Sequence, residues 1–483
     1  MEGQDFDILI IGAGLSGICA GHYVQQECPD KSFAILEGRE SLGGTWDLFQ
    51  YPGIRSDSDM HTLGFSFRPW PNPQAIADGP SILEYLRDTA EETGVDEKIR
   101  YNQMVRRVSW STDDKRWTVV AEHPDTGEER EYTCKFLWFC TGYYRYDEGH
   151  FPDFPGAEDF EGELIHPQFW TDEIDYEDKE VVVIGSGATA VTLVPAMAEE
   201  AAHVTMLQRS PTYVMSLPEE DVVSERMKRF LGDAVGSALT RWKNILRQMF
   251  FYEASRAMPG VARRFITNLV RKAIGDEVDV DTHFNPSYDP WDQRLCFVPD
   301  EDLFDVLRDG SASIVTDHIE RLDKTGIELQ SGEHLDADLI VSATGLKLVV
   351  AGGVTAEVDG RPVTPGDETM YKGAMLSNVP NAVMSVGYTN ASWTLKCELI
   401  SQWTCRLIEH MDEHGHEMVV PRLPADEAGD EPLIDFNSGY VLRSLDILPN
   451  QGEKLPWRLY QNYILDSFLY RMTRVDDDAL DFA

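Results

Sequence analysis

Phe6-Asp7-Ile8-Leu9-Ile10-Ile11-Gly12-Ala13-Gly14-Leu15-Ser16-Gly17 is the stretch that decides the fold of this 483-residue chain. Its apolar first half is typical of a buried strand, its second half has the pattern GxGxxG, and a helical run follows. In this pattern the first glycine makes a tight turn, the second lets the backbone approach a pyrophosphate, and the third lets helix and strand pack closely. The N-terminus of the helix then faces the phosphate charge. The stretch therefore predicts a βαβ unit that binds a dinucleotide.

A second stretch repeats this arrangement in the middle of the chain. The apolar run Val181-Val182-Val183-Ile184 is followed by Gly185-Ser186-Gly187-Ala188-Thr189-Ala190, which has the pattern GxGxxA. One such pattern can be an ordinary glycine-rich turn, but two copies in the same strand-to-helix context argue against that interpretation. The chain is also too long for one compact core. We therefore predict an α/β fold class with two dinucleotide-binding domains, Rossmann-like and three-layered, and a helical insert.

The residues that end the second strand of each unit indicate which nucleotide binds there. Glu37 follows Gly14 by 23 residues, and a carboxylate at this place accepts hydrogen bonds from ribose hydroxyls, as FAD or NAD requires. Arg209 follows Gly187 by 22 residues, and a guanidinium there suits a 2′-phosphate. An ordinary surface arginine is the alternative. The matching register of Glu37 and Arg209 favours NADP at the second unit.

The strand-like segments and the linker give the expected domain limits. Two strand-like runs end in the turns Cys140-Thr141-Gly142 and Ala343-Thr344-Gly345, and 146–162 has a linker composition. We expect a first nucleotide domain at 1–148 and 346–483, a linker at 149–174, a second nucleotide domain at 175–215 and 292–345, and a helical insert at 216–291.

The insert combines an apolar helical face with a local excess of positive charge. Its apolar residues at helical spacing are Trp242, Ile245, Leu246, Met249 and Phe250. Residues 225–272 hold eleven Lys and Arg against three Asp and Glu. The favoured explanation for this positive charge is that it compensates the negative charge of acidic neighbours. Electrostatic steering of anionic NADPH and docking on an acidic membrane surface are the alternatives, with docking on a membrane the less favoured.

Overall charge and cysteine use exclude several classes of function. The net charge of −42, from 84 acidic and 42 basic residues, disfavours a nucleic acid partner because a polyanion would be repelled. Adaptation to a saline cytoplasm and simple compositional drift are both consistent with such acidity. Seven scattered cysteines have no metal-ligand spacing and no close redox pair, so we expect no metal, reduced thiols and a cytoplasmic location. Neither of the two long uncharged stretches, 181–198 and 373–395, is apolar enough throughout to span a membrane.

Two further motifs resemble a known family. Phe160, Gly162, His166 and Trp170 match FxGxxxHxxxW, which is the fingerprint of type I Baeyer–Villiger monooxygenases, whereas the sister flavin-containing monooxygenases usually end it in Phe or Tyr. The run from Gly43-Gly44-Thr45-Trp46 through Tyr51-Pro52-Gly53 to Asp57 matches a second family pattern, [AG]GxWxxxx[FY]P[GM]xxxD. The resemblance covers nearly the whole chain, and the sequence is similar to the mycobacterial ethionamide-activating monooxygenase subgroup. The resemblance implies FAD and NADPH as cofactors and O2 as a co-substrate.

The resemblance also implies a reaction and its residues. NADPH reduces the flavin, a C4a-peroxyflavin forms with O2, and its attack converts a ketone into an ester or lactone; thioethers are a second expected substrate. Arg294 is the expected catalytic cation beside the flavin, positioned by Asp57, although an interdomain salt bridge is the alternative for this pair. We expect FAD contacts from Gly12, Gly14, Leu15, Ser16, Gly17, Glu37, Gly44, Thr45, Trp46 and Asp57. We expect NADP contacts from Gly185, Ser186, Gly187, Ala188, Thr189, Arg209 and Ser210.

Other residues near these motifs receive weaker assignments. His166 is expected to be a hydrogen-bonded structural residue of the linker. The resemblance implies a phosphate-binding lysine at the place of Gln293, so binding of the 2′-phosphate depends more on Arg209 and Ser210. Trp393 and Asn390 are expected beside the flavin or substrate, with a place in the core as the alternative for Trp393. The competing functions are a flavin-containing monooxygenase acting on nitrogen or sulfur, which needs no Arg294, and a non-oxygenating NADPH-binding flavoprotein.

Overall fold

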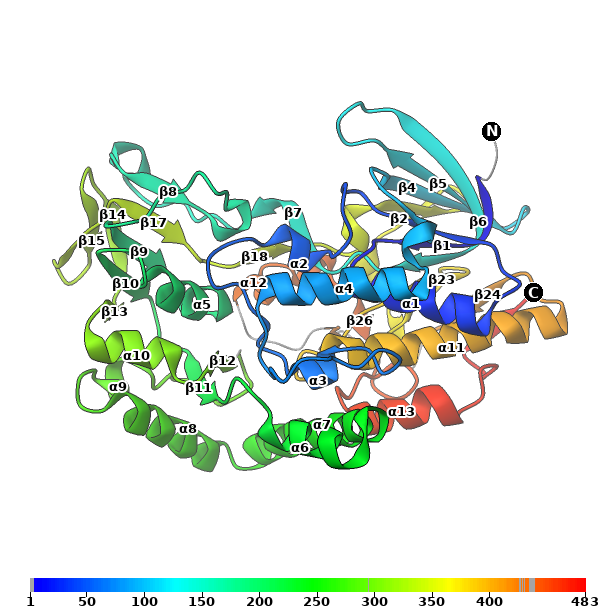
Figure 1. Cartoon of the computed structure of the whole chain (residues 1–483). Helices are drawn as coiled ribbons and strands as arrows, with labels where there is room; N and C mark the ends of the chain where they lie inside the picture. Colours follow the sequence, from blue (N-terminus) through cyan, green and yellow to red (C-terminus); the bar gives the residue numbers. More distant parts are fainter. Residues whose placement is uncertain (1–3, 294, 425–426, 428, 430, 434–438) are drawn as a thin grey trace.

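The computed structural model describes residues 4–293, 295–424, 427, 429, 431–433 and 439–483 (Figure 1). Its larger sheet has a parallel part in the order β3-β2-β1-β6-β23, in which β1 is the strand that precedes the first glycine-rich turn. These strands are β1 (Asp5–Ile11), β2 (Phe33–Leu36), β3 (Ile99–Arg100), β6 (Glu129–Phe139) and β23 (Ala382–Met384). The first half of β6 also pairs with β5 (Arg116–Glu122). From β5 the sheet continues through β4 (Met104–Ser111), β19 (Thr355–Val358) and β20 (Arg361–Val363).

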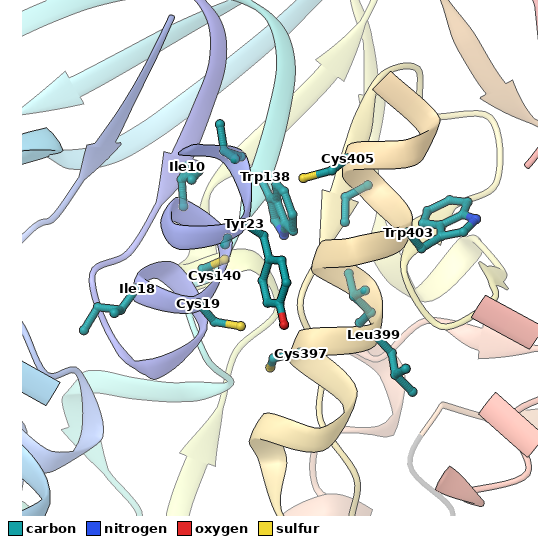
Figure 2. Packing of buried hydrophobic residues seen from close by; sticks show 14 of the residues in the cluster. Ile10, Ile18, Cys19, Tyr23, Trp138, Cys140, Cys397, Leu399, Trp403 and Cys405 are labelled. Carbon is teal, nitrogen blue, oxygen red and sulfur yellow. The ribbon is translucent and has the colours of Figure 1, made fainter. Parts of the chain in front are cut away.

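Helices from both ends of the chain pack together on this sheet. They are α1 (Leu15–Glu27), α4 (Gly79–Thr93), α11 (Trp393–His414) and, outside α11, α13 (Tyr463–Met472), with the short α2 (Thr45–Leu48) and α3 (Met60–Leu63) nearby. Figure 2 shows the contact between α1 and α11, where Cys19 and Tyr23 face Cys397 and Leu399. All seven cysteines are buried and none forms a disulfide. The thiols therefore serve as small apolar core residues.

The smaller sheet carries the second glycine-rich turn and is fully parallel. Its order is β13-β10-β9-β17-β8, with the bounds Ala312–Thr316, His203–Gln208, Glu180–Ile184, Leu339–Ser342 and Glu163–Ile165. Helices α5 (Ala188–Met197) and α10 (Asp302–Asp309) pack with its apolar residues. A separate antiparallel sheet is formed by β14 (Ile319–Leu322), β15 (Gly326–Leu329) and β16 (His334–Asp336).

Two strands carry the chain between the two nucleotide lobes. β7 (Tyr144–Gly149) leaves the first lobe, β18 (Leu346–Leu348) returns to it, and the two pair antiparallel. Short elements complete the described chain: β21 (Met370–Tyr371), β22 (Met375–Leu376), β24 (Val419–Pro421), β25 (Glu431–Pro432), α12 (Gly439–Leu442), β26 (Asn450–Gln451) and β27 (Leu480–Phe482). The residue numbers given above as domain limits stay a prediction.

The insert is helical, as the sequence predicts. Its helices α6 (Val222–Leu231), α7 (Asp233–Ala257), α8 (Pro259–Ile274) and α9 (Val280–His283) lie between β11 (Tyr213–Leu217) and β12 (Leu295–Pro299), which pair in parallel. Figure 1 shows α8, α6, α7 and α13 along one edge of the molecule. Within the described part of the chain, no helix is both long and apolar enough to cross a bilayer.

Candidate active site

One cavity of about 1840 Å³ is lined by both glycine-rich turns. Pockets for a single small ligand measure roughly 300–1,000 Å³, so this space is large enough for more than one ligand. Every residue expected to contact FAD or NADP lines this cavity except Gly17, and the lining residues include Asp57. The structure therefore gathers residues from distant parts of the sequence around one space between the two sheets.

The first glycine-rich turn needs glycine for reasons of space and backbone angle. Gly12 has φ +99°, and a β-carbon there would lie 2.6 Å from the carbonyl oxygen of Cys140. A β-carbon on Gly17 would lie 1.9 Å from the carbonyl oxygen of Gly12. Gly14 faces Gly44, whose Cα would lie 3.5 Å from a β-carbon on Gly14. Gly17 thus serves close packing, whereas Gly14 and Gly44 leave exposed backbone at the cavity wall.

Glu37 is fixed at the end of β2 by backbone hydrogen bonds. Its carboxylate accepts from the N–H of Ala13 at 2.7 Å and from the N–H of Arg39 at 3.0 Å. Burial raises the pKa of Glu37, and these two hydrogen bonds oppose the rise. Arg39 in turn forms an ion pair with Asp47 at 2.8 Å. Glu37 is held in one orientation toward the cavity, where it has further lone pairs to offer a ribose.

The second turn repeats the first in its main contacts. Gly185 has φ +147°, and a β-carbon there would lie 2.4 Å from the carbonyl oxygen of Ala343. Ala343 and Cys140 begin the two equivalent Thr-Gly turns, so each first glycine is held against the same kind of carbonyl. By contrast, a β-carbon on Gly187 would meet no atom within 4 Å. Gly187 therefore faces open space in the cavity.

Two guanidinium groups stand in the cavity wall near the second turn. Arg209 follows β10 as the sequence predicts, and Arg443 follows α12. Burial and then the charge of Arg209 lower the pKa of Arg443, which places the two cations within electrostatic reach. Among the described residues neither forms an ion pair with an acidic side chain. Sequence reasoning missed Arg443, because it lies in no recognisable motif and far from Arg209 along the chain.

The loop that carries Asp57 bridges the two lobes. Gly53 has φ +72°, and a β-carbon there would lie 2.7 Å from the β-carbon of Ala196 on α5. The Tyr-Pro-Gly part of the motif thus lets this loop touch a helix of the second lobe. Arg55 in the same loop pairs with Asp302 on α10. Asp57 itself lines the cavity and is half-buried.

Arg294 lies outside the described residues, but its neighbours Gln293 and Leu295 both line the cavity. The preceding stretch is held by the helical insert. Trp291, with φ +75°, packs against Phe251 and Tyr252 of α7. Asp292 accepts a hydrogen bond from Arg256 at 2.6 Å. The insert therefore positions the segment that leads to the predicted catalytic arginine.

Two buried acidic side chains in the cavity wall were not predicted from the sequence. Asp59 accepts from the N–H of His61 at 2.9 Å and from Arg247 of α7 at 3.0 Å. Burial raises the pKa of Asp59 to about 6. Asp466 on α13 pairs with Lys396 on α11 at 2.5 Å. The first pair connects α7 to the loop before α3, and the second connects α13 to α11. The partners of each pair are far apart in the sequence, so only the folded structure brings them together.

The fingerprint residues lie away from the cavity wall. His166 shares a hydrogen bond with the carbonyl oxygen of Gly345 at 3.0 Å through Nε2, and its Nδ1 accepts from the N–H of Gln168 at 3.2 Å. Burial lowers the pKa of His166. Because Nδ1 accepts from a backbone N–H, the proton of the neutral ring lies on Nε2. Gln168 also donates to the carbonyl oxygens at the start of β7. His166 therefore fastens the connection between the lobes. Of the remaining fingerprint positions, Gly162 abuts the carbonyl of Asp338, beside Phe160, and Trp170 packs on Tyr176.

Trp393 lines the cavity beside the first turn. Its indole N–H donates to the hydroxyl of Ser16 at 2.9 Å, and its ring stacks on Tyr143 with centroids 5.1 Å apart. Asn390 also lines the cavity and donates to the backbone of Gln461 at 2.9 Å. Both side chains therefore line the cavity, and their contact with the flavin or substrate stays a prediction.

The fold and the paired turns define an oxidoreductase that uses two dinucleotides, and comparison with known proteins gives the family. Residues 7–259 match the family described as flavin-binding monooxygenase-like. The chain is 52% identical over 482 residues to the FAD-containing monooxygenase EthA of Mycobacterium tuberculosis, with 99% of this chain and 98% of that protein covered. It is 45% identical over 482 residues to the probable FAD-binding monooxygenase AlmA of Acinetobacter baylyi, with 99% and 96% covered. The chain belongs to the family of flavin-binding monooxygenases, which confirms the predicted flavoprotein class.

Solved structures confirm the fold class. An oxidised steroid monooxygenase bound to NADP superposes with a TM-score of 0.77 at 21% identity over 99% of both chains. Cyclohexanone-bound cyclohexanone monooxygenase superposes with a TM-score of 0.70 at 23% identity, over 86% of this chain and 89% of that one. At this identity the likeness establishes the architecture of two dinucleotide-binding domains.

Proposed function

We propose that this protein is an FAD- and NADPH-dependent monooxygenase that converts ketones into esters or lactones with O2. The observation that carries the proposal is the single cavity lined by both glycine-rich turns, by Asp57 and by the two neighbours of Arg294. The names of the similar proteins add support, since they include an FAD-containing monooxygenase, a steroid monooxygenase bound to NADP and a complex with both FAD and NADP.

The two turns hold the two cofactors in this proposal. The first turn and the N-terminus of α1 bind the pyrophosphate of FAD, and Glu37 accepts hydrogen bonds from its ribose. The second turn and the N-terminus of α5 bind NADPH, and Arg209 pairs with its 2′-phosphate. When bound there, FAD would supply the capacity to accept hydride from NADPH and to activate O2.

The chain itself contributes charge and exclusion of water. Arg294 stabilises negative charge that develops on oxygen during the reaction, because a guanidinium keeps its charge at any working pH. Asp57 orients that guanidinium and balances its charge. The apolar part of the wall, with Trp46 and Trp393, limits access of water to the reacting atoms.

Replacement of Arg294 tests the proposal. Arg294→Ala should lower ester formation from a ketone by at least about 10²–10³-fold, because it removes one preorganised donor to a developing anion. FAD binding and hydride transfer should persist, and Asp57→Ala should have a milder effect. Oxygenation of a thioether should fall less, since that reaction generates no anionic oxygen on the substrate. NADPH oxidation and both products are measured in each variant.

Three results would contradict the proposal. Ester formation near the original rate in Arg294→Ala would show that Arg294 is only a structural cation. A native protein that oxygenates thioethers and amines but no ketone would be a flavin-containing monooxygenase of the sister group. If no substrate stimulates NADPH consumption, the protein is a non-oxygenating flavoprotein.

We also propose a cytoplasmic location. The seven cysteines are free and buried among the described residues, which fits a compartment that keeps thiols reduced. Fractionation of cells followed by detection of the native protein measures this directly.

A further inference from the structure

Four helices at one edge of the molecule expose apolar side chains to solvent. We call the outer surfaces of α6, α7, α8 and α13 the insert face; Figure 1 shows these helices along the same edge. The exposed apolar residues of the insert face are Val222, Val223, Phe230, Leu231, Val235, Leu239, Trp242, Leu246, Phe250, Val261, Phe265, Leu269, Ile464, Phe468 and Met472. Phe230 is 81% exposed and Phe250 76%. Monomeric soluble proteins rarely expose so many apolar side chains together, and such patches mark interaction sites.

The sequence of helix α7 places apolar side chains on the side of the helix that faces solvent. Apart from Ile245, its buried positions are small or polar, namely Gly236, Thr240, Asn244 and Ser255. Its exposed large apolar residues recur at helical spacing, namely Val235, Leu239, Trp242, Leu246 and Phe250. A helix of a soluble protein normally has the opposite arrangement. Trp242 contacts Tyr463 of α13, so the exposed stripes of the two helices adjoin.

The stripes on α8 and α13 follow the same spacing. Val261, Phe265 and Leu269 are four residues apart on α8, and Ile464, Phe468 and Met472 are four residues apart on α13. Each set therefore lies on one side of its helix. The apolar side chains of the insert face form ordered rows on neighbouring helices.

Positive charge accompanies the apolar rows. Six of the eleven cations in 225–272 pair with acidic side chains, which is the charge compensation that the sequence analysis favours. Arg226, Arg229, Arg264 and Lys272 are exposed and form no ion pair with a described acidic residue. On α6, Arg226 lies four residues from both Val222 and Phe230, and on α8, Lys272 lies three residues after Leu269. Compensation therefore accounts for six of the eleven cations. The half-buried Lys228 donates to the carbonyl oxygen of Trp70, and the other four remain exposed without an acidic partner.

We infer that the insert face docks on an anionic lipid surface. Rows of Trp, Phe and Leu beside Lys and Arg are the composition of helices that lie in the plane of a bilayer interface. The apolar side chains enter the boundary between headgroups and acyl chains, and the four free cations meet the anionic headgroups. The net charge of −42 does not prevent this, because at a Debye length of about 8 Å only charges near the docked face interact strongly with the surface.

Docking would place the cavity entrance against the lipid. Four exposed apolar residues of the insert face also belong to the cavity wall, namely Val222 and Val223 of α6 and Phe265 and Leu269 of α8. A lipophilic ketone dissolved in the bilayer could then enter without crossing water. This consequence rests on the proposed function, whereas docking itself does not.

Vesicle flotation tests the inference with the full-length protein carrying its flavin. The native protein is mixed, at about 0.15 M KCl, with vesicles of phosphatidylcholine alone or of equal parts phosphatidylcholine and phosphatidylglycerol. We expect flotation only with the anionic vesicles. Exchange of Arg226, Arg229, Arg264 and Lys272 for Gln, and separately Phe230→Ser with Phe250→Ser, should each weaken binding at least tenfold. None of these side chains lines the cavity.

Matched variants elsewhere on the surface provide the control. Exchange of the exposed cations Arg130, Arg321, Lys324 and Arg361 for Gln should leave flotation unchanged. The inference is overturned if the native protein does not float with anionic vesicles, if it floats equally with neutral ones, or if the variants of the insert face bind like the control. It is also overturned if light scattering shows a dimer that these variants dissociate while vesicles are not bound. Because flotation needs no turnover, a failure of docking is distinguishable from a failure of ketone oxygenation.

Discussion

Arg209 and Arg443 are notable because acidic residues outnumber basic ones by 84 to 42 in this chain, yet neither arginine has an acidic partner among the described residues. Two unneutralised guanidinium groups within electrostatic reach repel each other, and burial together with this repulsion lowers the pKa of Arg443. A ligand phosphate would relieve it. The family resemblance implies a phosphate-binding lysine at the place of Gln293, which is uncharged in this chain. We predict that Arg443 supplies the second positive charge for NADPH.

Single substitutions of these arginines separate their roles. Arg209→Ala should raise the Kd for NADP⁺ by roughly ten- to hundred-fold, because one charge-assisted contact contributes about 1.5–3 kcal/mol. Its Kd for NAD⁺ should change little. Arg443→Gln should weaken NADP⁺ binding in the same direction by a smaller factor, since Arg443 is further from the end of β10. Equilibrium titration of both nucleotides measures this. Equal affinity of the native protein for NAD⁺ and NADP⁺ would refute the assignment of Arg209.

Asp59 should make the stability of the protein depend on pH. Its pKa is about 6 in the folded protein and 3.8 when exposed. Between these values the folded state keeps a proton that the unfolded state loses, so the contribution to stability is full below pH 3.8 and is lost as pH rises through about 6. Asp59→Asn cannot ionise and should therefore gain up to about 3 kcal/mol over the native protein as pH rises from about 3 to 8, with roughly half of this gain above pH 5.

Thermal melts of both proteins across this pH range provide the measurement. Arg247, the partner of Asp59, is 57% exposed and can be solvated in the variant, so its loss of a partner should cost little. Asp113→Asn on an exposed turn controls for the removal of one negative charge. If the difference in melting temperature between Asp59→Asn and the native protein does not grow with pH, Asp59 is already ionised in the folded protein at low pH.

At the scale of elements, the second glycine-rich turn offers a matched pair of substitutions. Gly185→Ala puts a β-carbon 2.4 Å from a backbone carbonyl at a φ of +147°, so it should lower the melting temperature markedly. Gly187→Ala meets no atom within 4 Å, so the fold should keep its stability. The new methyl group would occupy the space where the pyrophosphate approaches, and NADP⁺ binding should weaken at least tenfold. Melting and nucleotide titration together measure both effects, and unchanged affinity in Gly187→Ala would place the nucleotide elsewhere.

These turns also show which features could be predicted from the sequence. Glycine spacing, strand ends and Glu37 are local signals, because the backbone geometry that they serve is built within one βαβ unit. Arg443, Asp59 and the pair of Asp466 with Lys396 depend on contacts between distant segments, and no local pattern marks them. The apolar period of α7 predicted a helix correctly, but period alone does not say which side faces inward. Ile245 is buried, whereas Leu246 and Phe250 face solvent.

At the scale of the whole molecule, acidic residues outnumber basic ones two to one, so many carboxylates have no cation to pair with. The ion pairs that do form are mostly at the surface, where each contributes about 0–1 kcal/mol and weakens with salt. The net effect of charge on the folded state is therefore repulsion. The cations of the insert reduce it locally by pairing with residues such as Asp59 and Glu398 from the first lobe.

Screening of this repulsion should stabilise the protein. The Debye length falls from about 10 Å at 0.1 M salt to about 3 Å at 1 M, which removes interactions between all but adjacent charges. We predict that the melting temperature rises by several degrees across this range in KCl and levels off above it, because nothing remains to be screened. Sucrose at matched osmolality stabilises by exclusion from the surface and has no such limit, so it controls for non-electrostatic effects. A melting temperature that stays flat or falls in KCl would mean that loss of the ion pairs outweighs relief of repulsion, and that the acidity of this chain is compositional drift.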